Sequence, residues 1–441
     1  MGKSTGRAPA RSRTVARLQR RMRAVLVAGL LLLAGPAAGC GLVAQGAGAG
    51  GSAAGTASTK GPHPGMPSVT APPSGAPTAP APSPTPGKGP RCPVLRCASV
   101  VVTGGMLVHS GIWQEAQKEA AASGKPGPDL LPMLEGQRRY LERSDLAICH
   151  QGTPVAKPDG PFSGHPSFNA PRQIVTAAKD VGYQACTTAG EHILDRATDG
   201  LLRTVDALDA AGLKHTGSYR TATESQQILI LQAPAAKVAV IGATFGINGK
   251  TPEYPWQVDM LDPSTMIAKA RKARSLGADV VIGAMYAGNG HGGDGHAGAP
   301  GTLQTDAARA LADSGQFNLV YGHSEAVLPI ENYRGTWIAY GLGHGTTEVS
   351  PAHPAGNEGL LVRAQFGQDA AGTWIVTDLA WTPTTMVGNP YRWCPAAADA
   401  PQGPCAGAPA HDATRQRTIG VVNSMGAAAA GAHELLITLE P

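Results

Sequence analysis

Four side chains of the kinds that bind metal ions or transfer protons follow short apolar runs of the sequence: His150, Glu191, His192 and His323. Imidazole and carboxylate groups are ligands for borderline divalent cations such as zinc, and histidine is often a general acid or base. Apolar runs of this length are typical of buried strands, so these side chains would lie at strand ends. We expect a polar site there, with His192 as the catalytic residue if the protein is an enzyme. The other three are candidate ligands for one divalent metal, zinc or manganese.

Each candidate also has a plainer explanation. A histidine at a strand end is often held by a backbone carbonyl, and Glu191 fits a solvated loop acid. The sequence His291-x-x-Asp294-x-His296 has metal-like spacing, but the glycines around it favour a mobile loop. His109 is expected to be an ordinary polar loop residue.

The elements around the first candidates alternate between strand and helix. Residues 146–149 and 183–187 have the pattern of buried strands, with a helical stretch between them and an amphipathic helix from Thr198 to about Gly212. Such alternation produces parallel strands, whose functional loops lie at their carboxyl ends. Hairpin-like runs follow, and those at 337–340, 360–366 and 374–380 are expected to form an antiparallel second sheet. We expect an α/β fold, an α+β sandwich of two packed mixed β-sheets flanked by helices.

The N-terminal 90 residues have the composition of targeting and linker segments. Eight basic residues and no acidic one precede an apolar run of 11 residues, too short to span a bilayer, and the small residues Ala37-Ala38-Gly39 come before Cys40. We predict a signal peptide with a lipobox over 1–40 and a lipid on Cys40, with plain secretion as the alternative. Residues 41–90, rich in Gly, Ala and Pro, are expected to form a disordered tether.

Charge and cysteine content restrict the choice of partners and compartment. The formal net charge of +5 comes from the signal segment, because without it 28 Lys and Arg face 31 Asp and Glu. No basic stripe remains, so nucleic acid is not an expected partner. Six cysteines besides Cys40 suggest disulfides in an exported chain, with 15 alternative pairings. We predict the pairs Cys92–Cys97, Cys394–Cys405 and Cys149–Cys186, the last across neighbouring parallel strands.

Several motifs in one order resemble the CapA family, the poly-γ-glutamate capsule biosynthesis proteins. They are S-D-L-A-I-C-H-x-x-T-P from Ser144, F-N-A-P from Phe168, H-x-L-D from His192, and later G-H, P-I-E and Y-G-L-G. The resemblance covers about residues 98–388, so we place a CapA-like domain at 91–388 and a C-terminal extension with the Cys394/Cys405 loop at 389–441. It implies a fold similar to that of calcineurin-like metallophosphoesterases.

The chain departs from the polar signature of the family at most strand ends. Residues that replace an expected Asp, Glu, Asn or His are Gly105, Gly152, Glu191, Tyr286, Ser324, Ala326 and His344. A two-metal site needs carboxylates between its cations, and two of these are lost. His344 then joins the candidate metal ligands.

The resemblance implies a lipoprotein in the biosynthesis of a capsule or other extracellular polymer, and the departures favour one without hydrolase activity. Its partners would be the polymer or envelope-assembly proteins, and its location the outer side of the cell membrane. The alternative is a residual metal-dependent hydrolase, of phosphoesterase or amidase type, acting on an extracellular polymer.

Overall fold

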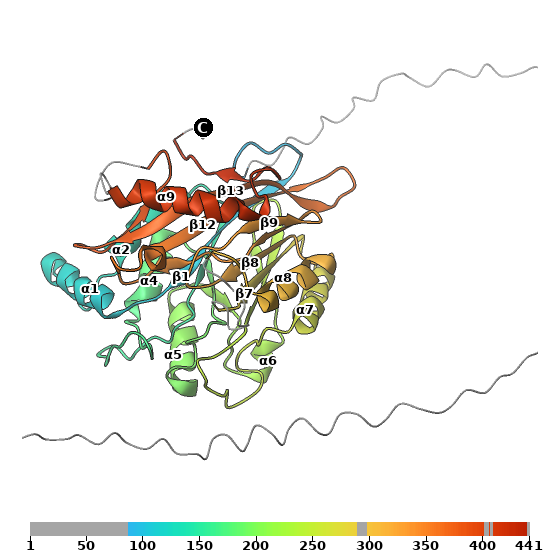
Figure 1. Cartoon of the computed structure of the whole chain (residues 1–441). Coiled ribbons are helices and arrows are strands. Elements are labelled where there is room, and N and C mark those ends of the chain that lie inside the picture. The colour runs from blue at the N-terminus through green and yellow to red at the C-terminus, as the bar shows by residue number, and fades with distance from the viewer. Residues whose placement is uncertain (1–86, 289–297, 401–404, 406–408, 439–441) are drawn as a thin grey trace, which may run out of the picture. The chain divides into compact units, whose positions relative to one another are not determined.

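The computed structural model describes residues 87–288, 298–400, 405 and 409–438. Their strands form two mixed sheets that pack face to face, with helices on the outer faces (Figure 1). This is the predicted fold class. The predicted signal peptide, most of the tether, Cys40 and the motif at 291–296 lie outside the described residues. Within the described ranges, no helix has both the length and the apolar composition needed to cross a membrane.

The first sheet has nine strands, and β1 (Cys97–Met106) lies near its centre. β1 pairs in parallel with β2 (Leu146–His150), and β3 (Ala185–Thr187) and β4 (Lys214–Thr216) continue the parallel series. On its other side β1 pairs antiparallel with β12 (Glu358–Gln368), which is followed by β13 (Trp374–Val387) and β14 (Arg392–Pro395). The short strands β11 (His344–Thr346) and β15 (His433–Glu434) join β1 and β13.

The second sheet has six strands in the order β5-β6-β7-β8-β10-β9. Its parallel centre consists of β6 (Lys237–Thr244), β7 (Val280–Tyr286) and β8 (Leu319–His323), joined by β10 (Thr336–Ala339). The antiparallel edges are β5 (Leu229–Gln232) and β9 (Ile330–Tyr333). β5 and β6 form a hairpin.

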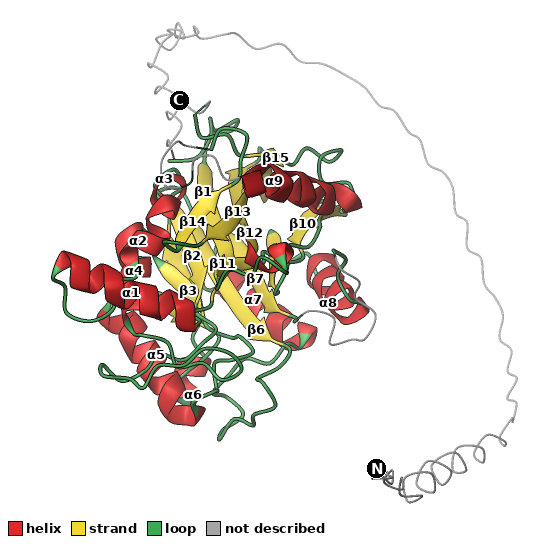
Figure 2. Ribbon diagram, turned by 60° about the vertical axis from the view of Figure 1, so that its left-hand side comes forward, coloured by secondary structure: helices red, strands yellow, loops and turns green. Residues whose placement is uncertain are grey.

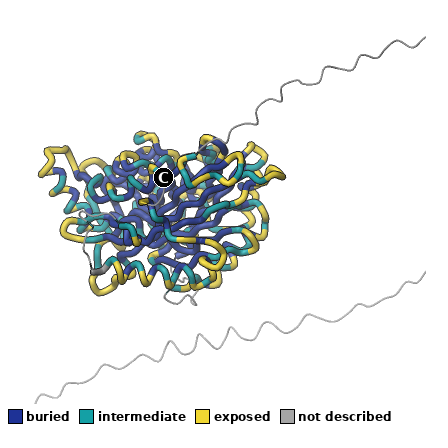
Figure 3. Tube along the Cα trace, turned by 90° about the horizontal axis from the view of Figure 1, so that it is seen from above, coloured by how far each residue is buried: buried dark blue, intermediate teal, exposed yellow. Residues whose placement is uncertain are grey.

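Both faces of each sheet are apolar because both are covered. In β1, Val100 and Val102 belong to the core between the sheets, whereas Val101 faces the outer layer of helices. Side chains of a strand alternate between faces, so a strand covered on both sides needs an unbroken apolar run. Figure 2 shows the helices in red on the outer faces of the sheets. The first sheet is covered by four helices: α1 (Ser110–Ser123), α2 (Leu131–Leu134), α4 (Gln173–Val181) and α5 (Ala197–Ala210). The second sheet is covered by α7 (Pro263–Ser275) and α8 (Thr302–Asp313). Figure 3 shows the buried segments gathered in the interior, with the exposed segments mostly at the edges.

Two expectations about the second half of the chain differ from the structure. Residues 360–366 and 374–380 do not belong to an antiparallel second sheet; as β12 and β13 they extend the first sheet beside β1, and only β10 lies in the second sheet, parallel to β8. Alternation of apolar residues identifies a strand but not its neighbour, which explains the error. The region 389–441, expected as an extension, contributes β14, β15 and α9 (Pro409–Val422) to the first sheet and its core.

The three predicted disulfides are present. Cys92 pairs with Cys97 and Cys394 with Cys405, with Cα atoms 5.7 and 5.5 Å apart. Cys149 and Cys186 are register partners on β2 and β3, with Cα atoms 4.4 Å apart. This third bond ties together the two strands whose ends carry site residues.

Candidate functional site

The carboxyl ends of strands from both sheets surround one cavity of about 330 Å³. β1 and β2 of the first sheet and β7 and β8 of the second all end there, as expected for parallel strands. The cavity is lined by seven histidines, at positions 109, 150, 165, 192, 323, 344 and 353, and by three glutamates, Glu191, Glu325 and Glu348. Such a concentration of imidazole groups makes this cavity the candidate functional site.

All five residues predicted for the site line this cavity: His150, Glu191, His192, His323 and His344. The sequence analysis did not single out His165 and His353, and it treated His109 as an ordinary loop residue. His165 and His353 lie on loops without an apolar run before them, and His109 lies three residues beyond the end of β1, where the pattern indicates a loop. Burial, together with the nearby histidines, lowers the pKa of His109 to about 4.

His150 and His323 form a stacked pair at the bottom of the site. Their ring centroids are 3.8 Å apart and the planes differ by 16°, and both side chains are almost fully buried. Burial lowers the pKa of His150 to about 3 and that of His323 well below its ordinary value. Both rings are therefore neutral at neutral pH.

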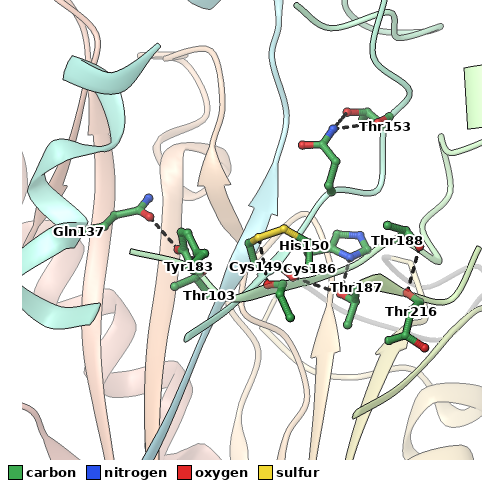
Figure 4. Close-up of a disulfide and its surroundings, with 12 residues drawn as sticks. Thr103, Gln137, Cys149, His150, Thr153, Tyr183, Cys186, Thr187, Thr188 and Thr216 are labelled. Carbon is green, nitrogen blue, oxygen red and sulfur yellow. Dashed lines mark hydrogen bonds between the residues drawn. A yellow bond between two sulfur atoms is a disulfide. The ribbon is translucent and has the colours of Figure 1, made fainter. Parts of the chain in front are cut away.

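Thr187, at the end of β3, connects this pair to the sheet. Its hydroxyl lies 2.9 Å from Nδ1 of His150 and 3.4 Å from Nε2 of His323. Figure 4 shows His150 and Thr187 directly beside the disulfide between Cys149 and Cys186. The disulfide thus fixes the two strand ends between which the first of these hydrogen bonds forms.

His192 is held by a buried carboxylate. Its Nδ1 lies 2.8 Å from Oδ2 of Asp195, whose side chain has no exposed surface. Asp195 also accepts hydrogen bonds from the backbone N–H of Phe168 and from Nδ2 of Asn248. A carboxylate bonded in this way fixes the orientation of the imidazole ring. His192 is therefore a positioned ring at the cavity wall rather than a mobile surface side chain.

His344 and Glu191 also have fixed partners. Nδ1 of His344 lies 2.8 Å from the carbonyl oxygen of Gly356, and the hydroxyl of Tyr286 donates to Oε2 of Glu191 over 2.9 Å. Burial lowers the pKa of His344, so this ring too is neutral at neutral pH. Burial raises the pKa of Tyr286 well above its ordinary value, so its phenol remains a donor. Tyr286, at a position where the family resemblance implies a histidine, therefore holds the carboxylate of Glu191.

The two glycines at positions where the family resemblance implies carboxylates, Gly105 and Gly152, differ in their surroundings. A Cβ atom on Gly105 would meet only Cδ2 of His150, at 3.4 Å. A Cβ atom on Gly152 would overlap Nε2 of His150 and approach the Gly190 Cα to 3.2 Å. A side chain at position 152 would therefore require the ring of His150 to move.

The paired-metal centre implied by the family resemblance does not fit these residues. Such a centre needs carboxylates between and around its cations, but His150 packs where a side chain at position 152 would begin. No three His, Cys, Asp or Glu side chains of the described ranges are grouped so that they could hold a metal ion. The Nδ1 atoms of His150, His192 and His344 are instead bonded to Thr187, Asp195 and the carbonyl of Gly356.

Comparison with known proteins gives a family match over this site. A family model described as bacterial capsule synthesis protein PGA_cap matches residues 99–345. The capsule biosynthesis protein CapA of Bacillus anthracis is 25% identical over 215 residues, covering 46% of this chain and 51% of that protein. The PGA biosynthesis protein CapA of Bacillus subtilis is 26% identical over 216 residues, covering 47% and 53%. The chain thus matches only about half the length of each of these relatives.

Solved structures with a similar arrangement are more distant. A putative 5'-nucleotidase from Staphylococcus aureus superposes with a TM-score of 0.43 at 13% identity, covering 73% of this chain and 58% of that one. A 5'-nucleotidase precursor from Thermus thermophilus gives 0.41 at 12% identity, covering 67% and 56%.

Proposed function

The chain belongs to the family of bacterial capsule synthesis proteins, PGA_cap, and from this membership we propose that it takes part in the biosynthesis of an extracellular polymer of the poly-γ-glutamate type. Its role in this proposal is to bind the polymer or a partner of its assembly in the histidine-lined cavity, without hydrolysing it. The named relatives from two Bacillus species, both described as biosynthesis proteins, support the polymer class.

The observation that carries the binding role is the packing of His150. Its ring is stacked on His323, bonded to Thr187 and pressed against the backbone of Gly152. A two-metal hydrolase needs carboxylates to hold its cations, and a carboxylate side chain at position 152 would have to occupy the space beside this ring. In this chain the space is filled by a neutral imidazole, which favours a binding cavity over a hydrolytic centre.

The proposal includes export and attachment to the membrane through a lipid on Cys40. Three disulfides link all six of the other cysteines. Disulfides persist in oxidising compartments, which supports a location outside the cytoplasm. Cys40 directly follows small residues, as in a lipobox.

A residual hydrolase is the second candidate, and His192 is the observation that favours it. Its ring is oriented by buried Asp195 and lines the cavity, as an acid or base would require. The two roles predict different phenotypes, because loss of a hydrolase lengthens a polymer whereas loss of a biosynthetic binding protein reduces its amount.

Deletion of the gene in the source bacterium tests the proposal. The amount and the chain length of surface glutamate polymer would be measured in the deletion strain and after complementation with the wild type or with Cys40→Ala. In the deletion strain we expect a lower amount of polymer with unchanged chain length. The wild-type gene should restore the amount. The Cys40→Ala variant should not, because the protein without its lipid is no longer attached to the membrane. An unchanged amount of polymer contradicts the proposed role, and longer chains favour the hydrolase.

A further inference from the structure

Apart from the histidines, the charged side chains of the described cavity lining are all acidic. Three glutamates line it, and no Lys or Arg is found among its described lining residues. Arg and Lys are the usual partners of carboxylates, Arg through paired hydrogen bonds. A chain of glutamate residues carries a carboxylate on every unit. The cavity is therefore unsuited to the body of such a polymer, although the proposed function requires that some part of the polymer be bound.

Two of the histidines present hydrogen-bond acceptors. Nδ1 of His344 faces a carbonyl oxygen, which only accepts, so this nitrogen carries the proton. Nδ1 of His192 faces the carboxylate of Asp195 and donates to it in the same way. In a neutral imidazole the other nitrogen then bears a lone pair. Neither Nε2 has a hydrogen-bond partner among the described residues, and both rings line the cavity.

A ligand complementary to this lining donates several hydrogen bonds and carries positive charge. A primary ammonium group has three donors and one positive charge, and it matches imidazole lone pairs and carboxylates together. A metal cation is the other ligand of this type, but no three side chains in the described ranges are grouped to hold one. The volume of about 330 Å³ suits one end group rather than an extended chain.

We propose that the cavity binds a primary ammonium group and, on the basis of the proposed function, that this group is the free amino end of the polymer. A γ-linked glutamate chain has one such end, which is the only point of the chain that carries a positive charge. The Nε2 atoms of His192 and His344 accept from the ammonium group, and the carboxylates of Glu191 and Glu348 balance its charge. The rest of the chain leaves the cavity toward solvent.

Calorimetric titration of the purified full-length chain in detergent tests this inference. The probes are a γ-linked glutamate pentamer with a free amino end and the same pentamer acetylated at that end. We expect the acetylated pentamer to bind roughly ten- to a hundredfold more weakly, because the charge-assisted hydrogen bonds are lost. Glu348→Gln should weaken binding of the free pentamer roughly two- to fivefold. The matched control Glu142→Gln, on an exposed residue outside the cavity, should not.

Three results would overturn the inference. They are equal binding of the two pentamers, binding of neither, and stoichiometric zinc or manganese that excludes the free pentamer. Failure here is distinguishable from failure of the proposed function, because the deletion strain reports polymer amount independently. If neither pentamer binds and the deletion still reduces the polymer, the ammonium site is wrong and the biosynthetic role stands.

Discussion

Replacement of Gly152 by alanine perturbs the site with one methyl group. The added carbon would overlap Nε2 of His150 and lie 3.1 Å from its Cε1 atom and 3.2 Å from the Gly190 Cα. The ring cannot move away easily, because it is 3% exposed, stacked on His323 and bonded to Thr187. Overpacking of this kind typically lowers the free energy of unfolding by about 1–3 kcal/mol. We expect a loss in this range for Gly152→Ala.

Two matched variants separate this effect from a general intolerance of glycine replacement. The first variant, Gly246→Ala, adds a methyl group that meets no atom within 4 Å. The second, Gly105→Ala, adds a methyl group whose nearest neighbour is Cδ2 of His150, at 3.4 Å. Both variants should unfold within about 0.5 kcal/mol of the wild type in urea titrations. If Gly152→Ala is as stable as Gly246→Ala, the ring of His150 does not occupy the space beside position 152. The reason given for the lost carboxylate would then be wrong.

Two further predictions concern the disulfide beneath the site and the buried imidazoles. A disulfide that closes a longer loop restricts the unfolded chain more strongly. The double variant Cys149→Ala/Cys186→Ala, which opens a separation of 37 residues, should therefore lower the unfolding free energy by about 4 kcal/mol. Cys394→Ala/Cys405→Ala, which opens a separation of 11 residues, should lower it by about 3 kcal/mol. The pKa of His150 is about 3 in the folded chain because of burial, so between pH 6.5 and 3 the unfolded chain binds a proton that the folded chain does not. The unfolding free energy should therefore decrease as the pH falls, and His150 alone should contribute about 2 kcal/mol of this decrease between pH 6.5 and 5. The variant His150→Asn should make the unfolding free energy less dependent on pH.

Urea titrations at several pH values check both predictions. A Cys149/Cys186 double variant with wild-type stability would show that this bond does not constrain the unfolded chain. Stability that is constant or rises between pH 6.5 and 5 would show that His150 is not held neutral in the folded protein.

The strand ends were predictable because His150, Glu191, His192 and His323 come at or within a few residues of the ends of apolar runs. His150, at the end of β2, and His323, at the end of β8, are last residues of strands that the sequence pattern locates. Glu191 and His192 follow β3 by a few residues. Parallel strands must bring such residues to one edge, so the shared cavity followed from topology.

The rest of the site depends on contacts between distant segments. His109, His165 and His353 reach the cavity through loops, whose course is set by tertiary packing and not by periodicity. The same holds for the close approach of Gly152 to Gly190, where a Cβ on Gly190 would lie 2.7 Å from the Gly152 Cα. The sheet to which a late strand belongs is likewise set by packing, which is why β12 and β13 were misplaced.

Metal content and phosphodiester hydrolysis, measured on one preparation of the full-length chain, test the central claim most directly. The claim is that the cavity binds a ligand without a paired-metal centre, because His150 fills the space beside Gly152. We predict less than one zinc, manganese or iron ion per chain, and hydrolysis of bis(p-nitrophenyl) phosphate at background rate with each added ion. Two ions per chain, with metal-stimulated hydrolysis that disappears in His192→Ala, would contradict the claim.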